Sequence, residues 1–414
     1  MLQQWNNMKK IWLYVFLSFP LLDYILRNWL PIPVIPSLWD EGVIFVLLLY
    51  IFLQYKGKFA KEDFPEAIFY PFIAFIVLGI SHLIIDLPNF AATLEGFRAV
   101  YQYMIALFIG MFLITKLEDG INMLRFITII GTIAAIVGLL QVILGVETPA
   151  SWIDASEQGL TRAFSFVVSP NVLGSYMILV GPMALGFVFY EKNKGWKLFW
   201  VASFIIIVLT LVFSGSRGAW LGLFGAIAIV FLFINRKLLI ATLVGSISLV
   251  MFVPMIRSRM LNLFSMEYFE KSSNDGRIGR WLDAFHIMQK DPFFGRGLGH
   301  YGGAVGDRYF GTIYVDSYYF KTIAETGIIG MMIYAWLIIA TFIFIYKNWK
   351  LWKGSIEFYL LGGVFIGLLS VILHNGVENI FEVPFMNSYF WFLVGLLLAF
   401  SSFKKGDHHE SKHE

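Results

Sequence analysis

The chain contains no cysteine and few charged residues. Without cysteine, neither a disulfide framework nor a thiolate-ligated metal centre can form. Charged residues make up 14% of the chain, whereas an ordinary soluble domain has roughly 25%. The net charge of +3 is too small to suggest a nucleic-acid partner. No Asp-x-Asp motif occurs, which argues against a metal-dependent nucleotide-sugar transferase, and we expect no metal and no cofactor.

Apolar residues, at 58% of the chain, gather in long runs. A helix needs about 20 apolar residues to cross roughly 30 Å of hydrocarbon, and it satisfies its own backbone groups there. We therefore predict an all-α integral membrane protein, a single polytopic domain over residues 1–414 with about twelve spanning helices. The first span is expected to remain as a signal anchor. The predicted spans are 11–30, 38–55, 67–85, 97–116, 124–145, 171–190, 198–213, 218–235, 238–256, 318–346, 356–374 and 386–403.

Lysines occur at every second boundary between the predicted spans. Because lysine and arginine accumulate on the cytoplasmic side, this alternation sets the orientation. We expect both termini and the tail 404–414 in the cytoplasm, and the loops 147–169 and 257–317 outside. The boundary residues are Lys9, Lys10, Lys56, Lys58, Lys61, Lys116, Lys192, Lys194, Lys197, Arg236, Lys237, Lys347, Lys350, Lys353, Lys404 and Lys405.

The predicted outer side carries arginine where the cytoplasmic side carries lysine. Positive charge outside opposes the insertion bias, so we expect a function for some of these arginines. A planar guanidinium binds phosphate through two hydrogen bonds, whereas a lysine ammonium is a point charge. The other interpretation is that single arginines reach lipid headgroups or pair with carboxylates. The outer arginines are Arg27, Arg98, Arg162, Arg217, Arg257, Arg259, Arg277, Arg280, Arg296 and Arg308.

Four of these arginines stand beside features that fix their position. Arg98 opens the fourth predicted span. Arg162 precedes Ser169-Pro170, a helix start whose unpaired N–H groups favour anions. Arg217 lies in a tight Ser-Gly-Ser corner between two spans, and Arg277 follows a turn-forming Asn-Asp-Gly sequence.

Two patterns in the large loop have structural interpretations. Trp281, Leu282, Phe285 and Met288 recur at helical spacing and predict a helix with one apolar face that packs on other loops or on the membrane surface. Residues 297–302 fit the letters of a dinucleotide-binding fingerprint, but no βαβ unit surrounds them. We interpret these glycines as turns or as points of close backbone approach.

The order of several short motifs resembles the O-antigen ligase and polymerase family. The resemblance covers about residues 160 to 330, and each motif alone is weak. The motifs are Arg162 with Ser169-Pro170-Asn171, Ser214-Gly215-Ser216-Arg217-Gly218-Ala219, Gly276-Arg277 with Trp281, Pro292 with Gly295, Gly297 and Gly299, Asp316-Ser317-Tyr318-Tyr319, and Glu325-Thr326-Gly327-Ile328-Ile329-Gly330.

The resemblance implies a metal-independent, GT-C-like glycosyltransferase in the bacterial cytoplasmic membrane. Such an enzyme moves an undecaprenyl-diphosphate-linked glycan onto a glycan, lipid or cell-wall acceptor outside the membrane. Arg162 and Arg277 or Arg280 match the family's functional arginines, and Arg217 matches its corner between spans. With Arg98, we expect Arg162 and Arg217 to bind the donor diphosphate.

The sequence departs from the family at the start of the tenth span. Ligases of the family commonly carry a histidine there, and this chain has Asp316. Asp316 is predicted to be catalytic, together with Arg277, Arg280 and Glu325, because a buried aspartate with a raised pKa can act as a base. Glu325 lies inside an apolar span and is expected to pair with an outer arginine. His374 is the alternative base.

The departure at Asp316 argues against a lipid A ligase. It favours a polymerase, or a ligase for another acceptor such as a cell-wall polymer of the teichuronic type. The rival function is a polytopic transporter or flippase for lipid-linked glycan, which would also carry outer and intramembrane charges. No convincing internal repeat supports that rival.

Overall fold

The computed structural model describes residues 2–30, 32, 34–55, 64–149, 161–274 and 276–410. The described part is built from helices and contains no strand, so the all-α prediction is confirmed. Nine described helices are long and apolar enough to cross a membrane. They are α3 (Val34–Tyr55), α4 (Glu66–Ile85), α7 (Leu117–Ile143), α8 (Pro170–Tyr190), α9 (Lys194–Ser214), α10 (Arg217–Ile234), α16 (Tyr318–Trp349), α17 (Glu357–His374) and α18 (Pro384–Glu410).

The other three predicted spans are interrupted helices, so twelve unbroken spans are not confirmed. Residues 11–30 divide into α1 (Leu2–Leu17) and α2 (Phe19–Trp29), where a proline occupies the first turn of α2. Residues 97–116 divide into α5 (Phe90–Tyr101) and α6 (Ala106–Phe112), joined by a 3₁₀ turn. The helix α11 (Arg236–Phe252) meets α12 (Pro254–Asn262) at a bend of 96°. Proline explains the first and third breaks because it lacks the N–H that an interior helical position donates.

Helix α18 forms the centre of the bundle. In its apolar window, 94% of the residues are buried, against 72% in α8 and 33% in α9 and α10. Glycines let α18 approach α6 closely, since a Cβ on Gly110 would collide with the Phe392 carbonyl and one on Gly395 with the Leu107 carbonyl. The core thus depends on backbone approach as well as on apolar side chains.

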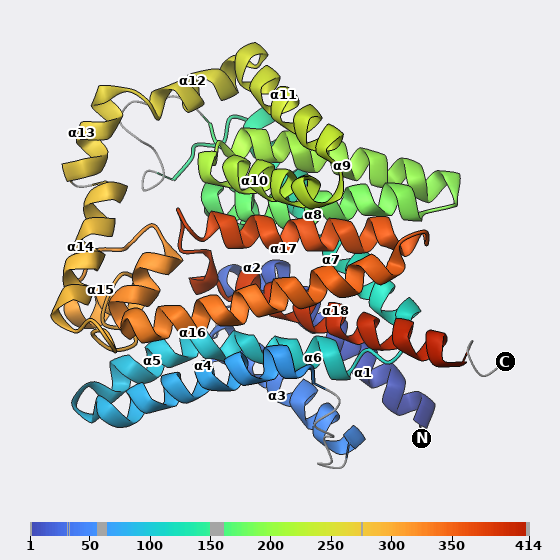
Figure 1. Cartoon of the computed structure of the whole chain (residues 1–414), viewed down its shortest axis with the longest axis horizontal. Coiled ribbons are helices and arrows are strands. Elements are labelled where there is room, and N and C mark those ends of the chain that lie inside the picture. The colour runs from blue at the N-terminus through green and yellow to red at the C-terminus, as the bar shows by residue number, and fades with distance from the viewer. Residues whose placement is uncertain are drawn as a thin grey trace.

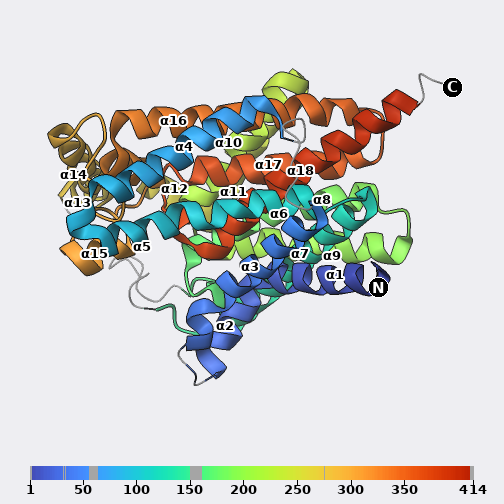
Figure 2. The same ribbon diagram turned by 90° about the horizontal axis from the view of Figure 1, so that it is seen from below.

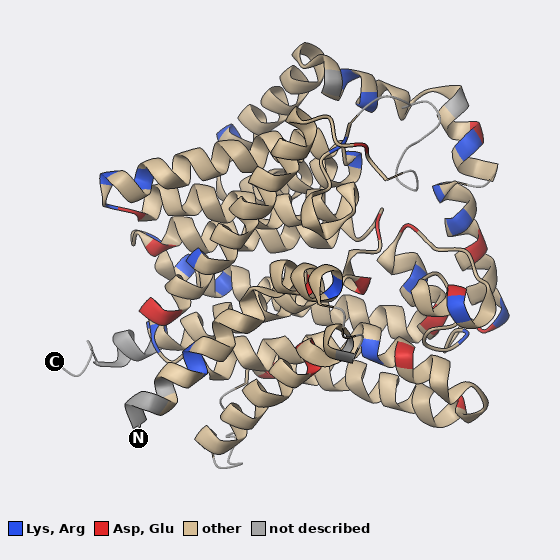
Figure 3. Ribbon diagram, turned by 180° about the vertical axis from the view of Figure 1, so that it is seen from behind, with Lys and Arg blue, Asp and Glu red and all other residues tan. Residues whose placement is uncertain are grey.

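Both chain termini lie at one end of the bundle, and the helices of the large loop lie at the opposite end (Figures 1 and 2). We call this opposite end the loop end. It carries α13 (Met266–Asn274), α14 (Arg277–Lys290) and α15 (Ala304–Phe310). Figure 3 shows few charged residues along the middle of the long helices, as expected for segments inside hydrocarbon.

Helix α16 is kinked at Gly327, and the preceding loop supplies the missing backbone partners. Gly327 has φ 68°, outside the helical region. The N–H of Ile328 donates to the Pro292 carbonyl at 2.8 Å, and the N–H of Gly297 donates to the Glu325 carbonyl at 2.9 Å. Gly297, Gly299 and Gly302 all have positive φ. The interpretation of these glycines as turns and close approaches is confirmed.

Helix α14 packs on α16 through part of its apolar face. Trp281 stacks on Phe320 of α16 with ring centroids 5.3 Å apart, and Met288 is buried. Leu282 and Phe285, however, are 51% and 42% exposed. The predicted helix is present, and part of its apolar face packs on α16. Packing of Leu282 and Phe285 on the membrane surface stays a prediction.

Candidate functional site

Arg162 is fixed at the junction of three segments. Its Nε donates to the Ser214 carbonyl at 2.9 Å and its Nη2 donates to Asn171 Oδ1 at 3.1 Å. The sequence explains both neighbours. Ser169 caps α8 by accepting from the Val172 N–H, as predicted, and Gly215 ends α9 in the left-handed region at φ 63°. The guanidinium is therefore held beside the N-terminus of a long helix.

Glu378 connects Arg162 to the large loop. It lies in the turn between α17 and the 3₁₀ turn Ile380–Glu382, and it is 6% exposed. Asn171 Nδ2 donates to Glu378 Oε2 at 2.7 Å, and Arg277 Nη2 lies 3.4 Å from the same oxygen. Because Asn171 also accepts from Arg162, its amide bridges a cation and a carboxylate.

Asp316 continues the chain of contacts into α14. Its Oδ2 accepts from Arg280 Nη1 at 3.1 Å and lies 3.6 Å from Arg277 Nε. Trp281 Nε1 donates to the Asp316 carbonyl at 3.3 Å. We call Arg162, Asn171, Arg277, Arg280, Asp316 and Glu378 the Glu378 network. It brings together three of the predicted arginines and the predicted aspartate.

Burial is the largest influence on Glu378 and raises the pKa of its carboxyl group to about 7. The nearby Asp316 also raises the pKa. Arg277, the Asn171 hydrogen bond and Arg162 lower it, but not enough to offset burial. A carboxyl group with this pKa exchanges protons near neutral pH, which suits a general acid or base.

His374 and Arg217 lie beside the network. His374 is buried, and its Nδ1 is 2.5 Å from Ser175 Oγ. A Cβ on Gly218 would lie 2.8 Å from His374 Nε2, so the start of α10 touches the imidazole. Arg217, the first residue of α10, places its guanidinium 5.0 Å from the ring centre of Tyr268. The corner that carries Arg217 thus packs against the turn that carries Glu378.

Arg98 is placed elsewhere. Its guanidinium pairs with Glu41 of α3 and donates from Nε to Gln102 at 3.2 Å. Among the described residues, no recorded contact joins Arg98 to the Glu378 network. The structure therefore separates Arg98 from the arginines with which the sequence grouped it.

Glu325 pairs with a lysine, so its predicted pairing with an outer arginine is wrong. Lys321, one helical turn earlier in α16, places Nζ 2.8 Å from Glu325 Oε2 and 3.3 Å from Glu382 Oε1. Both members of the Lys321–Glu325 pair are buried. The i, i+4 spacing explains the outcome, because it brings the two side chains together on one face of the same helix.

No group of three or more His, Asp or Glu side chains is positioned to hold a metal ion in the described segments. The absence of a metal remains a prediction.

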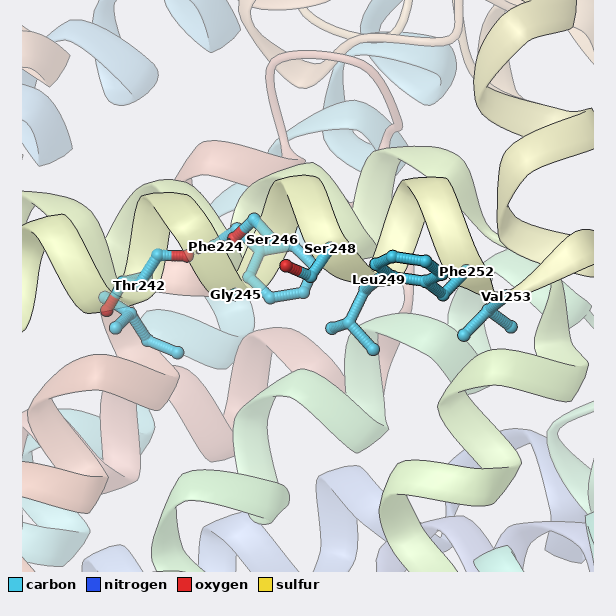
Figure 4. A pocket seen from close by; sticks show the side chains of 9 residues that line it. Phe224, Thr242, Gly245, Ser246, Ser248, Leu249, Phe252 and Val253 are labelled. Atoms are coloured by element: carbon cyan, nitrogen blue, oxygen red, sulfur yellow. Dashed lines mark hydrogen bonds between the residues drawn. The ribbon is translucent and has the colours of Figure 1, made fainter.

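A groove of about 540 Å³ between α10 and α11 is unsuited to a diphosphate (Figure 4). Its lining is mostly apolar, and its Thr242 and Ser246 hydroxyls already donate to carbonyls of their own helix.

Sequence reasoning missed Glu378 and Asn171 as site residues. Asn171 stood next to a recognised helix start, and Glu378 stood four residues after His374, but neither had a local pattern that indicated chemistry. They lie 207 positions apart in the chain, so only the fold reveals their hydrogen bond.

Residues 202–335 match the sequence model of a family described as O-antigen ligase. The matched segment runs from within α9 into α16 and includes Arg217, Arg277, Arg280, Asp316 and Glu325. No curated protein matches the chain. The family implies a glycosyl-transferring membrane enzyme. The match confirms the resemblance seen in the sequence and supports placing the chain in the O-antigen ligase and polymerase family.

Proposed function

We propose that the protein transfers a glycan from undecaprenyl diphosphate to an acceptor at the outer face of the bacterial cytoplasmic membrane. One observation carries the proposal: Arg162, Arg277 and Arg280 come from two distant parts of the chain and meet two carboxylates at the loop end. The family match supports the same type of enzyme.

The network suits an anion because it brings three arginines together among the described residues. Arg162, Arg277 and Arg280 face Asp316 and Glu378, three cationic groups against two acidic ones. Guanidinium forks bind phosphate oxygens in the same way as they bind carboxylates. A donor diphosphate can therefore take over arginine contacts that the two carboxylates now make.

The chemistry breaks the bond between the anomeric carbon and the phosphate oxygen. The electron pair of that bond goes to the diphosphate, and the arginines stabilise the developing charge in a preorganised site. The acceptor hydroxyl forms the new bond to the anomeric carbon and loses its proton to a base. Asp316, Glu378 and His374 are the titratable groups at this position.

Transfer by the purified full-length protein in lipid vesicles tests the proposal. With undecaprenyl-diphosphate-linked glycan and an acceptor, we expect a new glycosidic bond and release of undecaprenyl diphosphate, unaffected by a metal chelator. Using the same glycan as acceptor separates a polymerase from a ligase for a cell-wall polymer. Movement of the donor across the bilayer without bond formation would instead support the transporter.

The outward orientation is a separate part of the proposal. Ser273 lies in α13 at the loop end, and Ser355 lies between α16 and α17. In this cysteine-free chain, Ser273→Cys should react with a membrane-impermeant reagent on intact cells, and Ser355→Cys should react only after permeabilisation. The opposite pattern would place the network on the cytoplasmic side and contradict the proposed donor side.

A further inference from the structure

The two oxygens of Glu378 are used unequally. Oε2 receives both the Asn171 amide at 2.7 Å and the Arg277 guanidinium at 3.4 Å. Oε1 makes no hydrogen bond within the described part of the chain. Asn171 therefore holds the carboxylate in place while one oxygen stays available to accept a proton.

The contacts of Arg277 with the two carboxylates of the network are long for charge-assisted hydrogen bonds, which are typically about 2.7–2.9 Å. Its guanidinium lies 3.4 Å from Glu378 and 3.6 Å from Asp316. By contrast, Arg162 is anchored to the Ser214 carbonyl at 2.9 Å. Because these two contacts are long, an arriving diphosphate can compete with Glu378 and Asp316 for Arg277.

We infer that Glu378 accepts the proton of the acceptor hydroxyl, and that the donor diphosphate makes Glu378 a stronger base by taking Arg277 from it. The inference rests on the proposed function and names the base within it. In the step, the acceptor O–H bond breaks and the proton goes to Glu378 Oε1. The acceptor oxygen bonds to the anomeric carbon, and the bond to the diphosphate breaks with its electron pair on the leaving diphosphate. Asp316 is then a positioning residue that orients Arg277 and Arg280.

The charged groups around Glu378 determine the sign of the pH effect. Arg277 of α14 and Arg162 before α8 lower the pKa of Glu378, whereas Asp316 raises it. Tyr314, in the loop before α16, also faces Glu378, and burial raises the pKa of its phenol, so it stays neutral here. Transfer of Arg277 to the diphosphate removes the largest lowering influence and adds negative charge, so the pKa of Glu378 rises above about 7 when the donor binds.

Transfer rates test the role of Glu378 directly. In the wild type, kcat/KM should rise with pH around 7, as Glu378 of the free enzyme loses its proton, and kcat should rise at a higher pH. Glu378→Gln should lower transfer by about a hundredfold or more and abolish the rise. Glu378→Asp should keep the rise at a lower rate. Glu357→Gln, at the opposite end of α17, is the control and should behave as the wild type.

Binding of undecaprenyl diphosphate, measured by calorimetry in buffers of different ionisation enthalpy, gives a readout independent of transfer. Glu378 in the free protein is about half protonated at pH 7, so the wild type should take up a fraction of a proton, at most about half, that Glu378→Gln does not take up. Absence of binding to the wild type would contradict the proposed function itself. Binding and transfer with equal proton uptake in both proteins, or an unchanged pH dependence in Glu378→Gln, would overturn only the assignment of Glu378.

Discussion

The Glu378 network and the surroundings of Arg98 contain the same types of residue in opposite proportion. Around Arg98, the structure gathers Arg27, Asp23, Asp40 and Glu41. Two arginines there meet three carboxylates, whereas three arginines meet two carboxylates around Glu378. The sequence placed arginines from both regions in one diphosphate site. We therefore expect the local set of charged neighbours, and not the presence of arginine alone, to distinguish a site for an anion.

Alanine substitutions of the arginines should show the largest difference between the two regions. Arg162→Ala and Arg277→Ala each remove a preorganised positive charge and should lower transfer by about a hundredfold or more, with partial recovery in the lysine variants. Arg98→Ala should cost less than about tenfold, because an exposed ion pair contributes little. Initial transfer rates at equal amounts of folded protein measure the difference. An Arg98→Ala loss as large as that of Arg277→Ala would join the two regions into one site.

Substitution of Asp316 should lower the transfer rate less than substitution of the arginines. The size of the loss distinguishes a positioning residue from the base within the network. Asp316→Asn should keep more than about a hundredth of the transfer rate, since loss of a general base typically costs 10²–10⁴-fold. Loss of its charge frees Arg280, so undecaprenyl diphosphate should bind more tightly. Binding and the pH profile of transfer check both expectations. If Asp316→Asn abolished the rise of rate with pH and Asp316→His restored it, Asp316 would be the base.

The smallest effect on transfer is expected at Lys321 and Glu325, whose charges pair with each other. Lys321→Met leaves the buried Glu325 and the partly buried Glu382 without their cation, and breaking a buried pair costs about 3–5 kcal/mol of stability. Combining Lys321→Met with Glu325→Gln should recover much of that stability. Thermal unfolding of the purified protein measures the recovered stability. Transfer per folded molecule should change less than roughly threefold, because the ion pairs of Lys321 and Glu325 lie outside the network. A loss of transfer in the stable double variant would support Glu325 as catalytic.

Local sequence signals predicted much of the fold. Long apolar runs located the helices, and Ser169 and Gly215 marked helix ends because their physical roles depend on adjacent residues. The interruptions were missed because apolar composition does not distinguish one helix from two. Helices α11 and α12 are together apolar enough for one span, although they meet at a bend of 96°.

The candidate site was predictable only in part. Arg162, Arg277 and Asp316 were identified by residue type and by resemblance, and the fold brings them into one network. Glu378 could not be assigned because its properties come from burial and from a partner in α8, which a single sequence does not encode locally. The partner of Glu325 was misidentified because distant arginines were weighed above Lys321, four residues away.

The kink at Gly327 limits where this protein can be joined to a relative in a chimaera. The N–H groups of Ile328 and Ile329 donate to the carbonyls of Pro292 and Phe293. In return, the carbonyls of Ala324 and Glu325 accept from the N–H groups of Arg296 and Gly297 in the preceding loop. A chimaera that replaced α16 alone would combine a kink with a loop of another shape and leave these backbone groups without partners inside the protein. Residues 291–330 therefore have to be exchanged together. Chimaeras joined outside this range should express and fold better than those joined within it.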